Sequence, residues 1–298
     1  MLIEKLFDNL ALTVDAFAIC RVADGWRLRL PEFGFVSLHF AIQGTGGIRD
    51  ASGDVHVLPQ DSLAIVPAGL AHSIECGRGV LAENTPGDRT VHDMPDHLAG
   101  EMDEVRLIVA CGQIRAVYGA GLGLFERLSE VIVLDFSEEP IMRSTFQALL
   151  REQQTATPGA QAMMGSLMTQ CLVLVFRRLC DQGACRLPWL AALEDERMSR
   201  VLDAILTRPE QPHSLESLAE VAIMSRAAFA KQFRTSFDRP PMEYVREVRL
   251  RRAAQLLRSQ SNLSIEAAAH RVGIASRSQF SKAFHDHFGV SPKDFRTQ

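Results

Sequence analysis

The stretch SRSQFSKAFHDHFGVSPKDFR, from Ser276 to Arg296, carries aromatic residues at a regular spacing. Phe280, Phe284 and Phe288 follow one another every four residues, so they lie one above another on a single helical face. Gly289 comes directly after the last of them and is suited to ending a helix. The stretch therefore predicts a helix that packs through its aromatic face.

The same arrangement occurs once before, 51 residues upstream, so the chain contains an internal repeat. Ahead of the phenylalanines the offset falls to 50, which places one extra residue in the turn of the second copy. The matched positions are Phe229, Phe233, Phe237, Pro241 and Tyr244 in the first copy and Phe280, Phe284, Phe288, Pro292 and Phe295 in the second.

Each copy indicates a helix-turn-helix unit. A short helix with small residues precedes each aromatic helix, and small residues let two helices cross closely. Ser225 and Ser276 are candidate N-caps for the aromatic helices. In such a unit the second helix can enter the major groove of DNA. We expect the units at about residues 215–235 and 264–288, joined by a connector helix over 242–259.

The helical faces opposite the phenylalanines carry hydrogen-bond donors suited to phosphates and base edges. A solvated polar face of an ordinary helical repeat is the alternative, and two matched copies joined by a basic helix argue against it. The basic face of that connector carries Arg246, Arg249 and Arg252. The donor-bearing residues are Arg226, Lys231, Gln232 and Arg234 in the first copy and Arg277, Ser278, Gln279, Ser281 and Lys282 in the second.

From about Arg197 to Arg296 the chain resembles the C-terminal DNA-binding domain of the AraC/XylS family of transcriptional regulators. The resemblance rests on LAEVAIMSRAAFAKQFR, on PPMEYVREVRLRRAAQLL and on AAAHRVGIASRSQFSKAFHDHFGVSPKDFR. Ile223 departs from the family pattern, because it stands in the first turn where members often have glycine. The resemblance implies a sequence-specific regulator that binds double-stranded DNA, and RNA polymerase as well if it is an activator.

The resemblance also implies a division of roles among these side chains. In the first unit it assigns base contacts to Ala227, Ala230 and Lys231. Because alanine offers only methyl contacts, we expect the second recognition helix to contribute more of the discrimination. Base contacts in the second unit are assigned to Arg277, Ser278, Ser281 and Lys282, and phosphate contacts to Arg226, Gln232, Arg234 and Gln279.

Charge is distributed unevenly along the 298 residues. Residues 195–298 hold 17 Lys and Arg against 12 Asp and Glu, whereas residues 1–194 hold 15 against 24. A basic C-terminal part beside an acidic N-terminal part fits a nucleic-acid binder with a separate sensing domain. Neither a signal peptide nor an apolar run of ~20 residues is evident, so we expect a cytoplasmic protein without membrane contact and with reduced cysteines.

The N-terminal part alternates short apolar runs with turns, which predicts an antiparallel β-barrel. Gly44, Gly46 and Gly47 indicate a hairpin turn within it, since no helix follows for a phosphate loop. The order of strands and turns resembles the cupin-type barrel of AraC-like regulators. The expected strands lie at residues 35–42, 55–58, 62–67, 105–112 and 131–136.

Residues 138–186 change to a helical period, with an amphipathic helix followed by an apolar one over residues 163–179. The family resemblance implies that these helices form a homodimer interface, and the alternative is that they only cover the barrel. We thus expect an α+β protein of two domains. The segments are a barrel over 1–136, helices over 137–181, a linker over 182–196 and an all-α DNA-binding domain over 197–298.

An enzyme is the alternative for the N-terminal part, because many cupins hold a catalytic metal. Such a site needs clustered histidines with a carboxylate, whereas His39, His56 and His72 are scattered and suit structural roles. We therefore predict no catalytic residues, no metal and no cofactor.

The cysteines leave the signal open. The barrel resembles that of a subgroup of regulators that includes oxidant sensors, which makes Cys20, Cys111 and Cys76 candidate redox-sensing residues. Reactivity requires a lowered thiol pKa and access to solvent, so buried inert thiols are the alternative. A small organic effector inside the barrel is the competing signal. We expect Cys171, Cys180 and Cys185 to be packing residues.

Overall fold

The computed structural model describes residues 7, 10–15, 17–77, 79, 82–84, 96–118, 122–125, 128–155, 157–180, 189, 190, 192, 195–260 and 262–297. The chain divides into two compact units. One consists of residues 11–116 and 123–179, and the other mainly of residues 180–298. Most of the expected linker, 182–196, lies outside the described residues.

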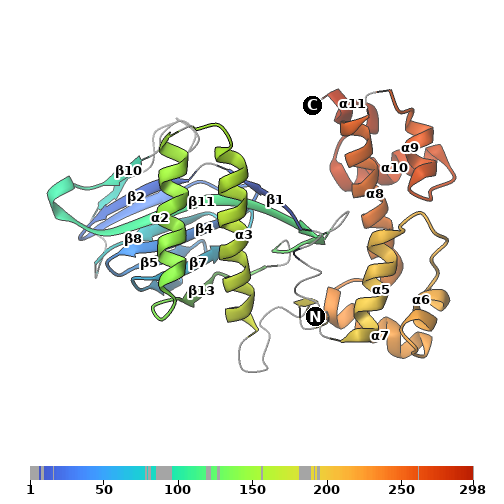
Figure 1. The fold of residues 1–298 in the computed structure, drawn as a ribbon, viewed down its shortest axis with the longest axis horizontal. Coiled ribbons are helices and arrows are strands. Elements are labelled where there is room, and N and C mark those ends of the chain that lie inside the picture. Colours follow the sequence, from blue (N-terminus) through green and yellow to red (C-terminus); the bar gives the residue numbers. More distant parts are fainter. Residues whose placement is uncertain are drawn as a thin grey trace. The chain divides into compact units, whose positions relative to one another are not determined.

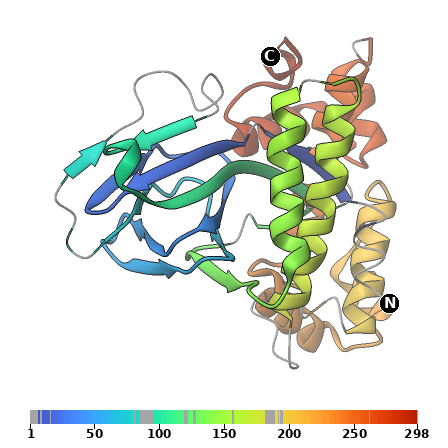
Figure 2. The same ribbon diagram turned by 60° about the vertical axis from the view of Figure 1, so that its left-hand side comes forward.

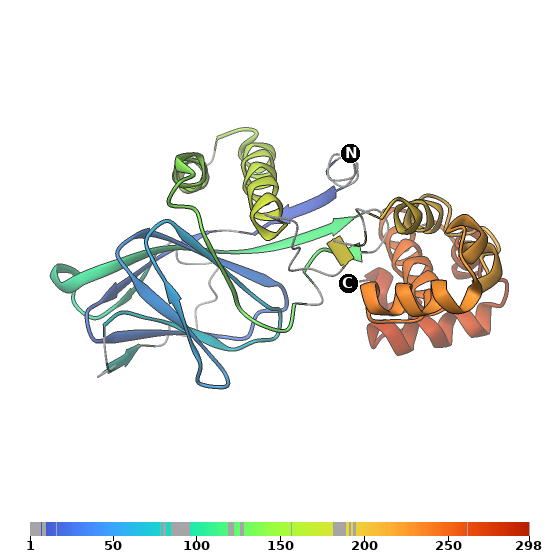
Figure 3. The ribbon, with the colours of Figure 1, turned by 90° about the horizontal axis from the view of Figure 1, so that it is seen from below.

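The N-terminal unit contains two β-sheets (Figures 1 and 3). The larger has the order β10-β2-β11-β4-β7-β13, with β1 and β12 also paired to β11, and the smaller has the order β6-β5-β8-β3-β9. Their bounds are β1 Leu10–Val14, β2 Ala18–Ala23, β3 Trp26–Leu30, β4 Val36–Gln43, β5 Gly46–Asp50, β6 Val55–Leu58, β7 Ser62–Val66, β8 His72–Glu75, β9 Ala82–Asn84, β10 Asp96–Ala99, β11 Val105–Tyr118, β12 Leu122–Gly123 and β13 Ile132–Asp135.

One apolar core holds the two sheets together. Val22 and Val109 of the larger sheet share it with Leu28, Ile48 and Ile74 of the smaller one. The predicted fold class is confirmed, although the described strands form two sheets and not a single closed one. Most pairs are antiparallel, as expected, but β10 pairs with β2 and β9 with β3 in parallel.

The glycine-rich segment after β4 differs from the prediction. A hairpin would pair β4 with β5, yet the two strands belong to different sheets, so the segment around Gly44 passes from one sheet to the other. Gly44 has φ +79°, and a Cβ there would collide with the carbonyl oxygen of Arg106. Glycine is thus required by close backbone approach, and not by a hairpin turn.

Helices α2 (Pro140–Thr155) and α3 (Ala160–Leu179) pack side by side on the outside of the larger sheet (Figures 1 and 2). Phe146 of α2 stacks on Phe40 of β4 with ring centroids 4.5 Å apart. Arg143 donates to the carbonyl oxygen of Ile42 at 2.9 Å and to the Asp61 carboxylate at 2.6 Å. Strand β4 is consequently buried on both faces over its first six residues, which include the polar Ser37 and His39.

Among the described residues, α3 alone is long and apolar enough to cross a bilayer by length and composition. Core helices of water-soluble proteins meet the same criterion, and the two charged residues of α3, Arg177 and Arg178, fall in its last turn. Its buried residues are Met164, Met168, Cys171, Leu172, Val175, Phe176 and Leu179.

The C-terminal unit is all-helical in its described part (Figure 1). Helix α8 runs through it, with one helix-turn-helix toward each of its ends. The helices are α5 Glu196–Thr207, α6 Leu215–Val221, α7 Arg226–Phe237, α8 Pro241–Ser259, α9 Ile265–Arg271, α10 Arg277–Phe288 and α11 Pro292–Thr297.

The turns of the two copies adopt the same backbone conformation at matched positions. Gly273 has φ +76° in the second copy, and Ile223, 50 residues earlier, has φ +55° in the first. A Cβ at Gly273 would lie 2.5 Å from the carbonyl oxygen of Glu210, so glycine is required there. Ile223 has space because its side chain is 77% exposed, but a β-branched residue is strained in this region. The turn of the first copy thus has the same left-handed conformation as that of the second, and Ile223 is strained as a result.

Replacing Ile223 by glycine should stabilise the C-terminal unit by about 1 kcal/mol, because the relief of left-handed strain exceeds the entropy that glycine loses on folding. Urea denaturation of the full chain, followed by circular dichroism of its helices, measures the change. The matched control is Gly273→Ala, which should destabilise the unit. Equal or lower stability of Ile223→Gly would contradict the strain argument.

Candidate nucleic-acid interface

Four serines begin the helices of the two helix-turn-helix units. Ser214 and Ser264 cap the first helix of each unit, and Ser225 and Ser276 cap the second. Each side chain accepts a hydrogen bond from a backbone N–H three residues later, which satisfies a donor that the helix leaves unpaired. The two copies are therefore built alike at their helix starts.

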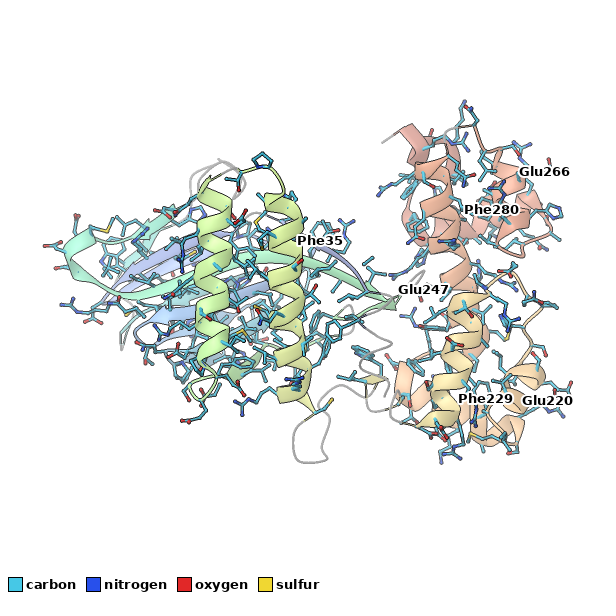
Figure 4. All side chains as sticks on the ribbon, viewed as in Figure 1. Phe35, Glu220, Phe229, Glu247, Glu266 and Phe280 are labelled. Atoms are coloured by element: carbon cyan, nitrogen blue, oxygen red, sulfur yellow. The ribbon has the colours of Figure 1, made fainter. Side chains whose placement is uncertain are left out.

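The aromatic stripes fix how the second helices face. Phe229, Phe233 and Phe237 are fully buried on α7, as are Phe280 and Phe284 on α10. Figure 4 labels Phe229 and Phe280, one in each unit. Because these sides are buried, the opposite sides of α7 and α10 face outward.

The outward face of α7 is poor in hydrogen-bonding groups. Ala227 and Ala228 are exposed in its first turn, and Ala230 is half-buried. Lys231 and Arg234 are exposed further along the helix, and Arg226 is exposed at its start. This face offers methyl groups near its N-terminus and charges at its margins.

The outward face of α10 is richer in donors. Arg277, Ser278 and Gln279 are exposed in its first turn, with Lys282 exposed one turn later and Ser281 half-buried beside it. The first turn of a recognition helix is where base edges are contacted in helix-turn-helix proteins. All of the residues predicted for the second unit are thus exposed or half-buried within the first two turns of α10.

Gln232 lies differently from the prediction. Its Nε2 donates to Asp195 Oδ2 at 2.8 Å, and its side chain is half-buried between α7 and the start of α5. A side-chain amide held inside the unit is poorly placed to hold a phosphate. The two residues are 37 positions apart, and no sequence pattern indicates the contact.

The connector helix α8 is less uniformly basic than expected. Arg249 donates to the carbonyl oxygens of Pro209 and Gln211, both at 2.7 Å, and burial lowers its pKa. Glu247, labelled in Figure 4, is paired with both Arg239 and Arg251. These arginines support the fold of the unit.

Arg246 occupies a different position on α8. It lines two adjacent clefts, of about 710 and 610 Å³, which are both bordered by residues of α8 and α10. Gln279 and Lys282 line the smaller cleft with it. Arg249 lines the smaller cleft as well, but its guanidinium is held by backbone carbonyl oxygens, whereas Arg246 is exposed.

His39 and His72 of the N-terminal unit are hydrogen-bonded to each other in the interior. His72 Nδ1 lies 2.9 Å from the Leu70 carbonyl oxygen and so carries the proton, which leaves its Nε2 to accept from His39 Nε2 at 2.8 Å. Burial lowers the pKa of both rings. Within the described part of the chain, no three His, Cys, Asp or Glu side chains converge as metal ligands.

Cys20 and Cys111 lie on neighbouring strands and face the same interior space. With His39 and His97 they line a cavity of about 10 Å³, roughly the room of one water molecule. Burial, and then the contact with Cys20, raises the pKa of Cys111 well above its usual value. Burial also raises the pKa of Cys76. The three candidate thiols are thus buried and free, and the two whose pKa is raised are protonated at neutral pH.

The last cysteines of the N-terminal half differ in part from the prediction. Cys171 is free and buried among packing residues, and burial raises its pKa to about 12. Cys180, in contrast, is disulfide-bonded, so the expectation that all six cysteines are reduced is wrong. Cys185 lies outside the described residues.

Two family models match the chain, a cupin model over residues 2–181 and a helix-turn-helix domain model over residues 218–298. The transcriptional regulator AlkR of Acinetobacter baylyi is 26% identical over 99% of both chains. The RCS-specific transcriptional activator RclR of Escherichia coli is 26% identical over 93% of this chain and 90% of its own. A Chromobacterium violaceum structure of a regulator with an AraC-type DNA-binding domain covers 35% of this chain and 93% of its own, with 28% identity and a TM-score of 0.33.

Proposed function

We propose that this chain, a member of the AraC/XylS family of DNA-binding transcriptional regulators with an N-terminal cupin domain, recognises one operator. Both helix-turn-helix units take part in this recognition. The observation that supports this proposal is the pair of serine-capped units on one connector helix, each with an accessible outer face. A rigid connector sets the separation of two recognition helices, so they can enter successive major grooves.

In this proposal the two recognition helices contribute unequally to sequence discrimination. Base contacts in the first unit come from Ala227, Ala230 and Lys231, and Arg226 and Arg234 hold phosphates. The first three can add one charged donor and methyl contacts to thymine. The second unit supplies most of the discrimination, through base contacts by Arg277, Ser278, Ser281 and Lys282 and a phosphate contact by Gln279.

Selection of bound duplexes from a random pool of double-stranded DNA by the full chain tests the proposal. We expect a single enriched motif whose stronger part corresponds to the second unit. A pool that stays random after repeated selection would contradict sequence-specific binding.

The helical segment after the sheets supports the proposal of a homodimer. Met163, Leu167 and Leu174 recur on one side of α3, where Met163 is 51% exposed and the two leucines are half-buried. An apolar stripe along an outer helix is typical of a surface that a second copy covers. We therefore propose that α3 contributes to the interface of a homodimer.

The dimer is tested by sedimentation of the full chain at micromolar concentration, where we expect the mass of two copies. Introducing Leu167→Arg with Leu174→Arg should give the mass of one copy, because two charges would be buried in the interface. Gln161→Arg adds a charge at an exposed position off this stripe and serves as the control. A monomeric unaltered chain would rule the proposal out.

We also propose that the cupin domain receives the regulatory signal, as a small molecule or an oxidant, and that the protein acts in the cytoplasm without catalysis. If the signal leads to activation, RNA polymerase is the further partner. The raised pKa of Cys111 bears on the choice, since the thiolate is the reactive form. Direct oxidation of this thiol is disfavoured in the folded conformation.

At neutral pH the full chain should therefore alkylate slowly at Cys111 with iodoacetamide, and at least about tenfold faster once guanidinium unfolds it. Peptide mass spectrometry of both samples measures the two rates. Rapid alkylation of Cys111 in the folded chain would instead support direct sensing of an oxidant by this thiol. Replacing both Cys20 and Cys111 by serine would then be the next test, since an oxidant response that survives it excludes both thiols.

A further inference from the structure

The first recognition helix is hydrogen-bonded to the residue that caps α5. Gln232, on α7, donates from Nε2 to Oδ2 of Asp195 at 2.8 Å. Asp195 is the N-cap of α5 and accepts from the backbone N–H of Arg197 at 2.9 Å. One carboxylate thus caps α5 and accepts a hydrogen bond from α7.

The carboxylate is well suited to this role because it is anionic and heavily hydrogen-bonded. The Arg197 guanidinium donates to it through Nε at 3.0 Å and through Nη2 at 2.8 Å. Those bonds, followed by the backbone N–H and by Gln232, hold the pKa of Asp195 well below its usual range. A charged acceptor makes a stronger hydrogen bond than a neutral one.

The second unit is built differently at the matching position. The 51-residue offset that relates Phe229 to Phe280 relates Gln232 to Ala283. Ala283 is buried and lines both clefts beside α8. Because an alanine side chain makes no hydrogen bond, α10 cannot be held in this way, and the tie belongs to the first unit alone.

We infer that Asp195 is a positioning residue for DNA recognition, which sets the orientation of α7 through Gln232. The inference rests on the proposed recognition of DNA by both units. Base contacts depend on the angle at which a helix enters the groove. Because α7 offers few hydrogen-bond donors to the bases, its binding is sensitive to that angle.

A double-mutant cycle on the full chain tests the inference, with the duplex selected by the unaltered protein as the probe. Asp195→Ser keeps an N-cap but is too short to reach Gln232, and Gln232→Ala removes the donor. Each should weaken binding about fivefold, and the double variant should be no weaker than Asp195→Ser, because the hydrogen bond between Asp195 and Gln232 is already absent from that variant. Asp195→Asn retains an acceptor and should bind nearly as the unaltered protein does.

Two readouts separate positioning from a general structural defect or a direct phosphate contact. Substitutions in the half-site of the first unit should matter less to the Asp195→Ser variant, while those in the other half-site keep their effect. The salt dependence of binding should stay unchanged, because no phosphate contact is lost. Thermal unfolding shows whether each variant is folded.

Full affinity of Asp195→Ser, or additive effects in the double variant, would overturn the inference. So would a smaller salt dependence in Gln232→Ala, since that result would assign Gln232 to a phosphate. A random pool that yields no selected duplex contradicts the proposed function instead, and so the two failures are distinguishable.

Discussion

Replacing Phe284 by alanine is expected to lower the free energy of unfolding of the C-terminal unit by about 3 to 5 kcal/mol. Its ring is fully buried and contacts Phe280, Phe288 and Phe295, with centroids 5.5, 4.5 and 5.3 Å away. The substitution leaves a cavity where α10, α8 and α11 meet. Because α10 is oriented by this packing, DNA binding should be lost together with stability.

Urea denaturation of the full chain, followed by circular dichroism, measures the change in stability. Phe288→Ala is the matched control, because that ring is only half-buried and should cost less. A loss below about 1 kcal/mol for Phe284→Ala would contradict the packing account, since a well-filled core does not tolerate such a cavity cheaply.

Replacing Arg277 or Lys282 by alanine should each weaken binding to the selected duplex by about 1 to 3 kcal/mol and relax base preference at one position. Both side chains are exposed on the outer face of α10, where few other donors can replace them. Lys231→Ala on α7 should cost less, since its neighbours Ala227 and Ala230 leave that unit with little discrimination to lose.

Titration of each variant against the selected duplex and against single-base substitutions measures both effects. Lys293→Ala on α11 removes an equal charge from an exposed site away from α10 and should change affinity little. Unchanged affinity and unchanged base preference in both Arg277→Ala and Lys282→Ala would refute the assignment of the second unit as the dominant one.

The C-terminal unit could be predicted from sequence because its determinants are local. The four-residue phenylalanine spacing and the serine caps act within one or two helical turns, and the repeat doubles each signal. The structure keeps both copies, including the strained left-handed turn at Ile223 that matches Gly273. Local patterns likewise located five of the described strands, β4, β6, β7, β11 and β13.

What sequence could not supply depends on contacts between distant residues. Strand patterns do not say which sheet a strand joins, so the segment at Gly44 was expected to form a hairpin although it passes between sheets. Arg249 was expected on a basic surface, but it is held by carbonyl groups about 40 residues away in sequence. The hydrogen bond between Gln232 and Asp195 could not be predicted either, because Asp195 lies 37 residues away at the start of another helix.

The spacing of the two DNA contacts tests the central claim most directly. In a hydroxyl-radical footprint of the full chain on its selected duplex, each bound copy should protect two segments on one face of the DNA. Two recognition helices on one rigid connector predict centres about 34 Å apart, which is one helical turn. A single protected segment per copy, or two segments on opposite faces, would contradict recognition by both units.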